Sequence, residues 1–161
     1  DFDQLMTTDY DTYKIVISGI ASGNSGVNIS FLLQTTGESS GAYNAGSTYS
    51  WETSRTYDMD TYSQTSVAYG RIGRNGFGDS ASNRYASAEM TILNASSTVS
   101  YKMYHYRGFC TNHDGTNSGE TGAGIFKNDA RVTGVRFLYS AGTFATAVAG
   151  SSIALYGIVN S

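Results

Sequence analysis

The sequence predicts an all-β protein, built as an antiparallel β-sandwich. Helices are disfavoured because 19 Gly and many Ser, Thr and Asn residues interrupt every window long enough for a helical period. Between these interruptions the chain is rich in β-branched and aromatic residues, which suit strands. The chain contains no Pro, so its turns must rely on Gly and Asn, which readily adopt a positive φ.

Short segments with a period of two supply the expected strands. In each of them apolar side chains fall on one face and polar side chains on the other, as in a strand with one buried face. One-sided burial of many antiparallel strands requires a second sheet opposite the first. The alternating segments are Thr12 to Ser18, Ile29 to Leu33, Ala86 to Ile92, Val99 to Met103 and Val135 to Tyr139.

The end of the chain and three polar stretches complete this expected architecture. The last strand, Ile153 to Val159, is apolar on both faces, which is typical of a central strand. Within it, Gly157 is expected to let the strand bend or pack close to another backbone. Long loops, of the kind that often carries function when ordered, are predicted at Thr36 to Ser47, Gly73 to Arg84 and Gly108 to Gly124.

Length and composition exclude several classes of protein. The 161 residues fit a single domain, residues 1–161, and the first residue is not Met, so we expect a longer or processed chain. A formal charge of −3 without a basic run predicts no binding to nucleic acid. The apolar stretches are too short for membrane insertion. Cys110 is the only cysteine, which excludes an internal disulfide.

Both ends of the chain carry a recognisable pattern. The first is Tyr10-Asp11-Thr12-Tyr13-Lys14-Ile15-Val16-Ile17-Ser18-Gly19-Ile20, and the second comprises Val132 to Leu138, Ser140 to Phe144 and Leu155 to Ile158. Together they resemble a group of bacteriophage virion proteins, structural or tail-fibre proteins that open with a YDxYxIxxSG-like strand and close with an IrFxxSxGxF…LYGI-like hairpin. The resemblance frames the chain from about residue 9 to residue 158, with no diagnostic match between residues 36 and 84.

This resemblance implies a fold, a location and partners. The fold would be a jelly-roll-like sandwich, displayed at the surface of the phage particle on its head or its tail. The partners would be other virion proteins of the capsid or tail, and the protein would be a homo-oligomer, for which we expect a trimer. The family offers no catalytic residue and no cofactor to carry over.

Two groups of residues carry the chemistry of metal ligands. Their intervals match neither a zinc site with paired ligands nor an EF-hand loop. Scattered strand and loop residues are therefore the simpler interpretation, and we expect no metal, although an irregular calcium site stays the alternative for the second group. The first group is His105, Cys110, His113 and Asp114, and the second is Asn112, Asp114, Asn117 and Glu120.

The sequence predicts no enzyme. It lacks a G-x-S-x-G elbow and P-loop spacing. Glycoside hydrolysis would need two carboxylates roughly 5–10 Å apart across a cleft. The carboxylates considered for such a pair are Glu52, Asp58, Asp60 and Glu89, which we expect to be exposed, solvated side chains.

A group of aromatic residues is the candidate contact surface. Aromatic faces stack on sugars and anchor protein interfaces. The alternative is packing in the core, because two of these residues share one face of the expected strand Thr48 to Tyr57. The group consists of Tyr43, Tyr49, Trp51 and Tyr57.

The sequence leaves three candidate functions to be tested. The first is a virion structural module, a capsid decoration or cement protein, head fibre or tail fibre, that acts by protein–protein contacts. The alternative is a carbohydrate-binding module of a fibre, which would contact a host surface glycan through exposed aromatics and polar loops. A glycosidase is the third, and it would require a carboxylate pair that faces a groove.

Overall fold

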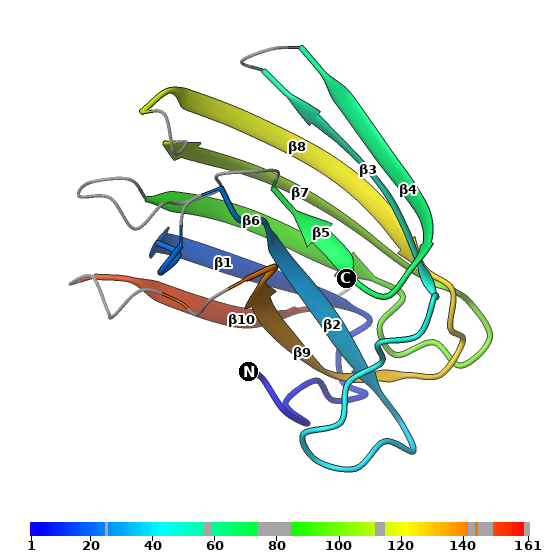
Figure 1. Cartoon of the computed structure of the whole chain (residues 1–161). Helices are drawn as coiled ribbons and strands as arrows, with labels where there is room; N and C mark the ends of the chain where they lie inside the picture. Colours follow the sequence, from blue (N-terminus) through cyan, green and yellow to red (C-terminus); the bar gives the residue numbers. More distant parts are fainter. Residues whose placement is uncertain are drawn as a thin grey trace.

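The computed structural model of the chain confirms the all-β prediction. It describes residues 1–24, 26–56, 59–73, 85–111, 115–141, 144 and 150–159. These residues form two antiparallel sheets and contain no helix (Figure 1). In the same part of the chain, therefore, no helix has the length and apolar character needed to cross a membrane.

The two sheets differ in size, and the smaller one lies over one face of the larger. In spatial order the larger sheet contains β10 (Ser152–Ile158), β1 (Thr12–Ile20), β6 (Ala86–Leu93), β7 (Lys102–Thr111), β8 (Asn117–Phe126), β3 (Tyr49–Arg55) and β4 (Thr61–Val67). The smaller sheet contains β5 (Gly70–Ile72), β2 (Ile29–Thr35) and β9 (Val132–Tyr139). This arrangement confirms the β-sandwich, while the finer jelly-roll connectivity stays a prediction.

The core lies between the sheets and is built from the alternating segments. Four of the five alternating segments bury the predicted apolar face, and these side chains form one continuous cluster. Phe31 of β2 lies at its centre, with the ring of Tyr104 edge-on at 4.7 Å and that of Tyr49 edge-on at 6.0 Å. The confirmed buried faces are Tyr13, Ile15 and Ile17; Ile29, Phe31 and Leu33; Ala86, Ala88, Met90 and Ile92; and Val135, Phe137 and Tyr139.

The predicted loop Gly108 to Gly124 is wrong, because most of it forms the β7–β8 hairpin. The two strands pair over ten residues, from Lys102 opposite Phe126 to Thr111 opposite Asn117. Glycine suggested a loop here, but Gly122 and Gly124 lie on the buried face of β8 beneath two tyrosine rings of β7. A Cβ at Gly124 would lie 2.5 Å from the Tyr104 ring, so these glycines make room for aromatic packing.

Replacing Gly122 with alanine is expected to lower the free energy of unfolding by about 2 kcal/mol. The added Cβ would collide with the Tyr106 ring and lie 2.7 Å from the Glu52 carbonyl oxygen of the neighbouring strand. Chemical denaturation measures the loss. The control Ala123→Ser, at the adjacent exposed position of β8, should change stability by less than about 0.5 kcal/mol. Equal losses in the two variants would contradict this packing role.

The segment Val99 to Met103 faces the opposite way from its prediction. Val99, Tyr101 and Met103 are exposed, and the strand begins only at Lys102. The buried side of β7 starts with Lys102 itself, which is 1% exposed. Its ammonium donates hydrogen bonds to the carbonyl oxygens of Ser97 at 2.7 Å, Ser100 at 2.8 Å and Asp129 at 2.9 Å. Backbone acceptors thus allow a lysine to occupy the face that apolar residues were expected to occupy.

The last strand is an edge strand, not a central one. β10 pairs with β1 on one side and ends the larger sheet there (Figure 1). Its apolar side chains are half-buried or exposed. Gly157 does allow a close approach, but its neighbour is the Tyr10 ring rather than another backbone. β10 is therefore apolar on both faces, although neither face is fully buried by other parts of this chain.

The other two predicted loops have different outcomes. No strand forms between residues 36 and 48, which confirms the loop Thr36 to Ser47. The loop Gly73 to Arg84 lies outside the described residues except for Gly73.

Candidate functional site

One face of the larger sheet is not covered by the smaller sheet, and we call it the outer face. The strand registers place its side chains in rows that cross all seven strands. One row is Tyr156, Lys14, Thr91, His105, Ala123, Glu52 and Ser63. The next is Ala154, Val16, Glu89, Arg107, Thr121, Ser54 and Thr61.

Three charged residues form an ion-pair cluster on this face. The Glu89 carboxylate accepts from the Arg107 guanidinium at 2.9 Å and pairs with the Lys14 ammonium at 3.2 Å. The hydrogen bonds from Arg107 and then Lys14 lower the pKa of Glu89, so the carboxylate stays ionised and cannot serve as a proton donor near neutral pH. The cluster is solvent-accessible and contributes little to stability. Its two cations and one carboxylate give this part of the outer face a net charge of +1.

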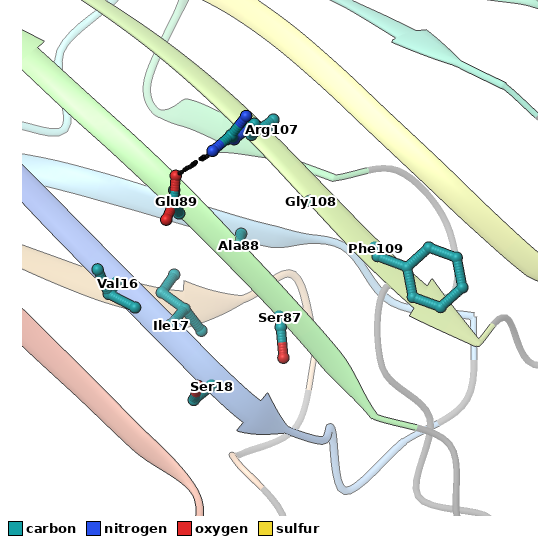
Figure 2. A pocket seen from close by; sticks show the side chains of 9 residues that line it. All are labelled: Val16, Ile17, Ser18, Ser87, Ala88, Glu89, Arg107, Gly108 and Phe109. Atoms are coloured by element: carbon teal, nitrogen blue, oxygen red, sulfur yellow. Dashed lines mark hydrogen bonds and ion pairs between the residues drawn. The ribbon is translucent and has the colours of Figure 1, made fainter.

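A depression of about 440 Å³, with both polar and apolar side chains in its walls, lies beside this cluster (Figure 2). Its walls come from β1, β6 and β7, and the exposed ring of Phe109 stands at one end. An exposed ring with neighbouring hydroxyl, guanidinium and carboxylate groups is suited to a ligand that has both polar edges and an apolar face. The outward-facing residues that line it are Val16, Ser18, Ser87, Glu89, Arg107 and Phe109.

An apolar depression of about 630 Å³ occupies another part of the outer face. Leu93, Met103 and Ile125 stand side by side on β6, β7 and β8, because Met103 pairs with both of the others. Met103 is 44% exposed and Ile125 is 40% exposed. Three neighbouring apolar side chains that face solvent form a surface suited to contact with another macromolecule.

The carboxylates considered for a glycosidase pair are not brought together in the part of the chain that the structure describes. Glu52 and Glu89 both lie on the outer face, but β7 and β8 separate their strands. Three inter-strand spacings amount to about 14 Å, more than glycoside hydrolysis requires. Asp60 is exposed beside β4, and Asp58 lies outside the described residues.

The residues considered as metal ligands do not converge in the part of the chain that the structure describes. His105 is exposed on the outer face of β7, whereas Cys110 is buried on the opposite face. Asn117 and Glu120 likewise point to opposite faces of β8. The remaining members of both groups, residues 112–114, lie outside the described residues. The described residues contain no cluster of three or more His, Cys, Asp or Glu that could hold a metal ion.

The predicted aromatic surface does not form as a unit. Tyr49 and Trp51 are 0% and 3% exposed, so core packing is the correct interpretation for both. Tyr43 is half-buried on the loop after β2, with the Arg136 guanidinium 4.3 Å from its ring centre. Tyr57 lies outside the described residues.

Sequence reasoning missed the residues that the outer face does expose. Phe109 fell inside the predicted loop Gly108 to Gly124, Ile125 belonged to no predicted strand, and Met103 was expected to face the core. The usable signal was the strict alternation on β7, where Met103, His105, Arg107 and Phe109 all point outward.

Comparison with known proteins gives no relative: no protein-family model, no curated protein and no solved structure matches this chain.

Proposed function

We propose that the protein is a non-enzymatic structural module of a bacteriophage particle, acting by protein–protein contacts at the particle surface. It would serve as a capsid decoration or cement protein, a head fibre or a tail fibre, and as a homo-oligomer. The resemblance of both chain ends to virion proteins supports the phage context. The outer face is the single structural observation that supports a contact function.

The composition of the outer face is suited to contact with another protein. Met103 and Ile125 provide exposed apolar area, and five of the fourteen positions in the two rows described above are Ser or Thr. The charges of Lys14, Glu89 and Arg107 are largely satisfied within the chain. A partner would therefore meet a surface with few unpaired charges to desolvate. Many copies on a particle would add modest affinities by multivalency.

Sedimentation of phage lysates tests this proposal. The chain is expected in the fraction of intact heads or in that of tails, as detected by peptide mass spectrometry. Purified protein with Met103→Glu should bind isolated particles at least about tenfold more weakly than the unaltered protein. The control Val99→Lys, at an exposed position in the β6–β7 turn, should bind normally. A chain that sediments with neither heads nor tails and does not bind them would refute the proposal.

The depression beside Phe109 favours a second candidate, a carbohydrate-binding module of a fibre. Phe109 offers a ring for stacking on a sugar, and Arg107, Glu89 and Ser87 offer hydrogen bonds around it. Binding to a glycan array is then expected to be lost in Phe109→Ala. Tyr101→Ala is the matched control, because Tyr101 and Phe109 are both 56% exposed. Absence of glycan binding by the unaltered protein, or equal losses in the two variants, would remove this candidate.

A further inference from the structure

β10 is an open sheet edge without the usual protection. It pairs with β1 over seven consecutive residues, Ser152 to Ile158, with no bulge. The sequence SIALYGI contains neither a charged residue nor Pro, the two common means of protecting an edge from pairing with another chain. Within the described residues, no backbone hydrogen bond joins its other side to any segment.

The other three edges of the two sheets are covered, distorted or very short, and β5 at the far edge of the smaller sheet has only three residues. The N-terminal segment covers β9, where Phe2 and Val135 exchange hydrogen bonds of 2.8 and 3.1 Å between their backbones. At the opposite end of the larger sheet, the pairing of β4 with β3 has a register shift. Ser66 on β4 also adopts a positive φ of 54°, which bends that edge. β10 thus differs in being regular, apolar and open.

The smaller sheet does not fully cover the apolar side chains of β10. Ile153 and Leu155 point toward the core side but are only partly buried. On the other face, Tyr156 is 52% exposed and Ile158 is 39% exposed. A strand added beside β10 would cover apolar surface on both faces as well as its open backbone groups.

The strand sequence is complementary to itself in one antiparallel register. When Leu155 is placed opposite its own copy, Tyr156 faces Ala154, Ile153 faces Gly157 and Ile158 faces Ser152. Tyr156 and Ile158 then meet the small residues Ala154 and Ser152, and Ile153 lies opposite Gly157, against which the Tyr10 ring also packs. A second copy of this chain is therefore a partner of suitable shape.

Charge does not oppose this pairing. Lys14 is the only charged residue of β1, the strand next to the edge, and it lies directly opposite Tyr156. Its ammonium is already paired with Glu89 at 3.2 Å. Two copies therefore bring no unpaired like charges from β10 or β1 to the contact.

We propose that two copies of the protein pair through β10, antiparallel and around a twofold axis at Leu155. The two larger sheets would then join into one continuous sheet, with both smaller sheets on the same side. The contact is isologous, since each copy contributes the same strand. The proposed particle role does not specify this contact. The dimer contact therefore holds or fails independently of that role.

Cysteine cross-linking of the purified protein tests both the contact and its register. The native Cys110 is buried, so the background is low. Leu155→Cys places two thiols directly opposite each other and is expected to give a disulfide-linked dimer on mild oxidation. Thr61→Cys, exposed on the other edge strand β4, is the control and should give at least about tenfold less dimer. Equal cross-linking at the two edges would overturn the proposal.

Sedimentation velocity of charge variants supplies a second, independent readout. The side chain introduced by Tyr156→Glu faces Lys14 within its own chain, so the monomer should stay folded. The substitution also places a negative charge in the contact between the two copies. We expect its dimer to dissociate at least about tenfold more readily, and Ala154→Lys in the same chain to restore pairing. An unaltered protein that is monomeric, or a trimer, which has no twofold axis, would overturn the proposal. A dimer that never sediments with particles would uphold this contact and refute only the particle role.

Discussion

Replacing Lys102 with methionine is expected to lower the free energy of unfolding by about 3 kcal/mol. Methionine keeps much of the side-chain volume but removes the donor that binds three backbone carbonyl oxygens. Two of these carbonyls, of Ser97 and Ser100, lie in the β6–β7 turn, and that of Asp129 lies in the connection between β8 and β9. The ammonium therefore ties together two connections that are distant in sequence. Urea denaturation measures the loss.

Lys14→Met is the matched control for this prediction. Lys14 also has a charged partner, Glu89, but its side chain is 39% exposed. Solvent-accessible ion pairs contribute at most about 1 kcal/mol, so the control should lose far less stability. If Lys102→Met were as stable as the unaltered protein, the three hydrogen bonds would not contribute to the fold.

A steep loss of stability is expected above about pH 10. Burial raises the pKa of Tyr49, Tyr104, Tyr106 and Tyr139 far above that of an exposed tyrosine. In the unfolded chain these phenols ionise at their ordinary pKa, whereas in the folded chain they stay protonated. The contribution of these tyrosines to the free energy of unfolding is complete below pH 10. It is lost as the pH rises toward the pKa values of the phenols in the folded chain. Together, the four tyrosines lower the free energy of unfolding by on the order of 5 kcal/mol for one pH unit above 10.

Lys102 acts in the opposite direction over part of this range. Burial lowers the pKa of its ammonium, so stability from this group rises with pH just below the ordinary lysine value. One lysine cannot offset four tyrosines, and the net result is alkaline unfolding. Circular dichroism and the ultraviolet absorbance of tyrosinate, followed together against pH, should change in the same transition.

Tyr139→Phe provides the control for the alkaline transition. The Tyr139 hydroxyl has no hydrogen-bond partner among the described residues, so its removal should leave stability at neutral pH unchanged or slightly higher. Above pH 10, the free energy of unfolding of this variant should fall with pH about one quarter less steeply than that of the unaltered protein. Ionisation of the tyrosines before unfolding would contradict the prediction.

The fold class and most core faces could be predicted from sequence because alternation reports one-sided burial directly. Ile15 and Phe31 lie where their periodicity predicts. The β8 strand could not be predicted, because Gly122 and Gly124 gain their role only from the tyrosine rings of β7. Lys102 was missed for a similar reason: its three acceptors come from turns whose arrangement exists only in the folded chain. The local sequence pattern does not indicate contacts between segments that are distant in the chain.

The candidate site was predicted less well than the fold. Trp51 and Tyr49 looked like a contact surface because aromatic residues serve both interfaces and cores, and only the register decides between these roles. The outer face depends on the order of seven strands, and neighbours such as Glu89 and Arg107 are far apart in the chain. Side chains that lie side by side across strands cannot be grouped before the topology is known.

The pairing of β1 with β10 also constrains how the protein folds. β10 adds to β1, so the segments between these two strands must all be synthesised before that ladder can form. The β6–β7 and β7–β8 hairpins need only local contacts and can form much earlier. During synthesis, the side of β1 that later receives β10 stays open to other strands. Docking of β10 is thus expected as a late step of folding, after the central hairpins have been established.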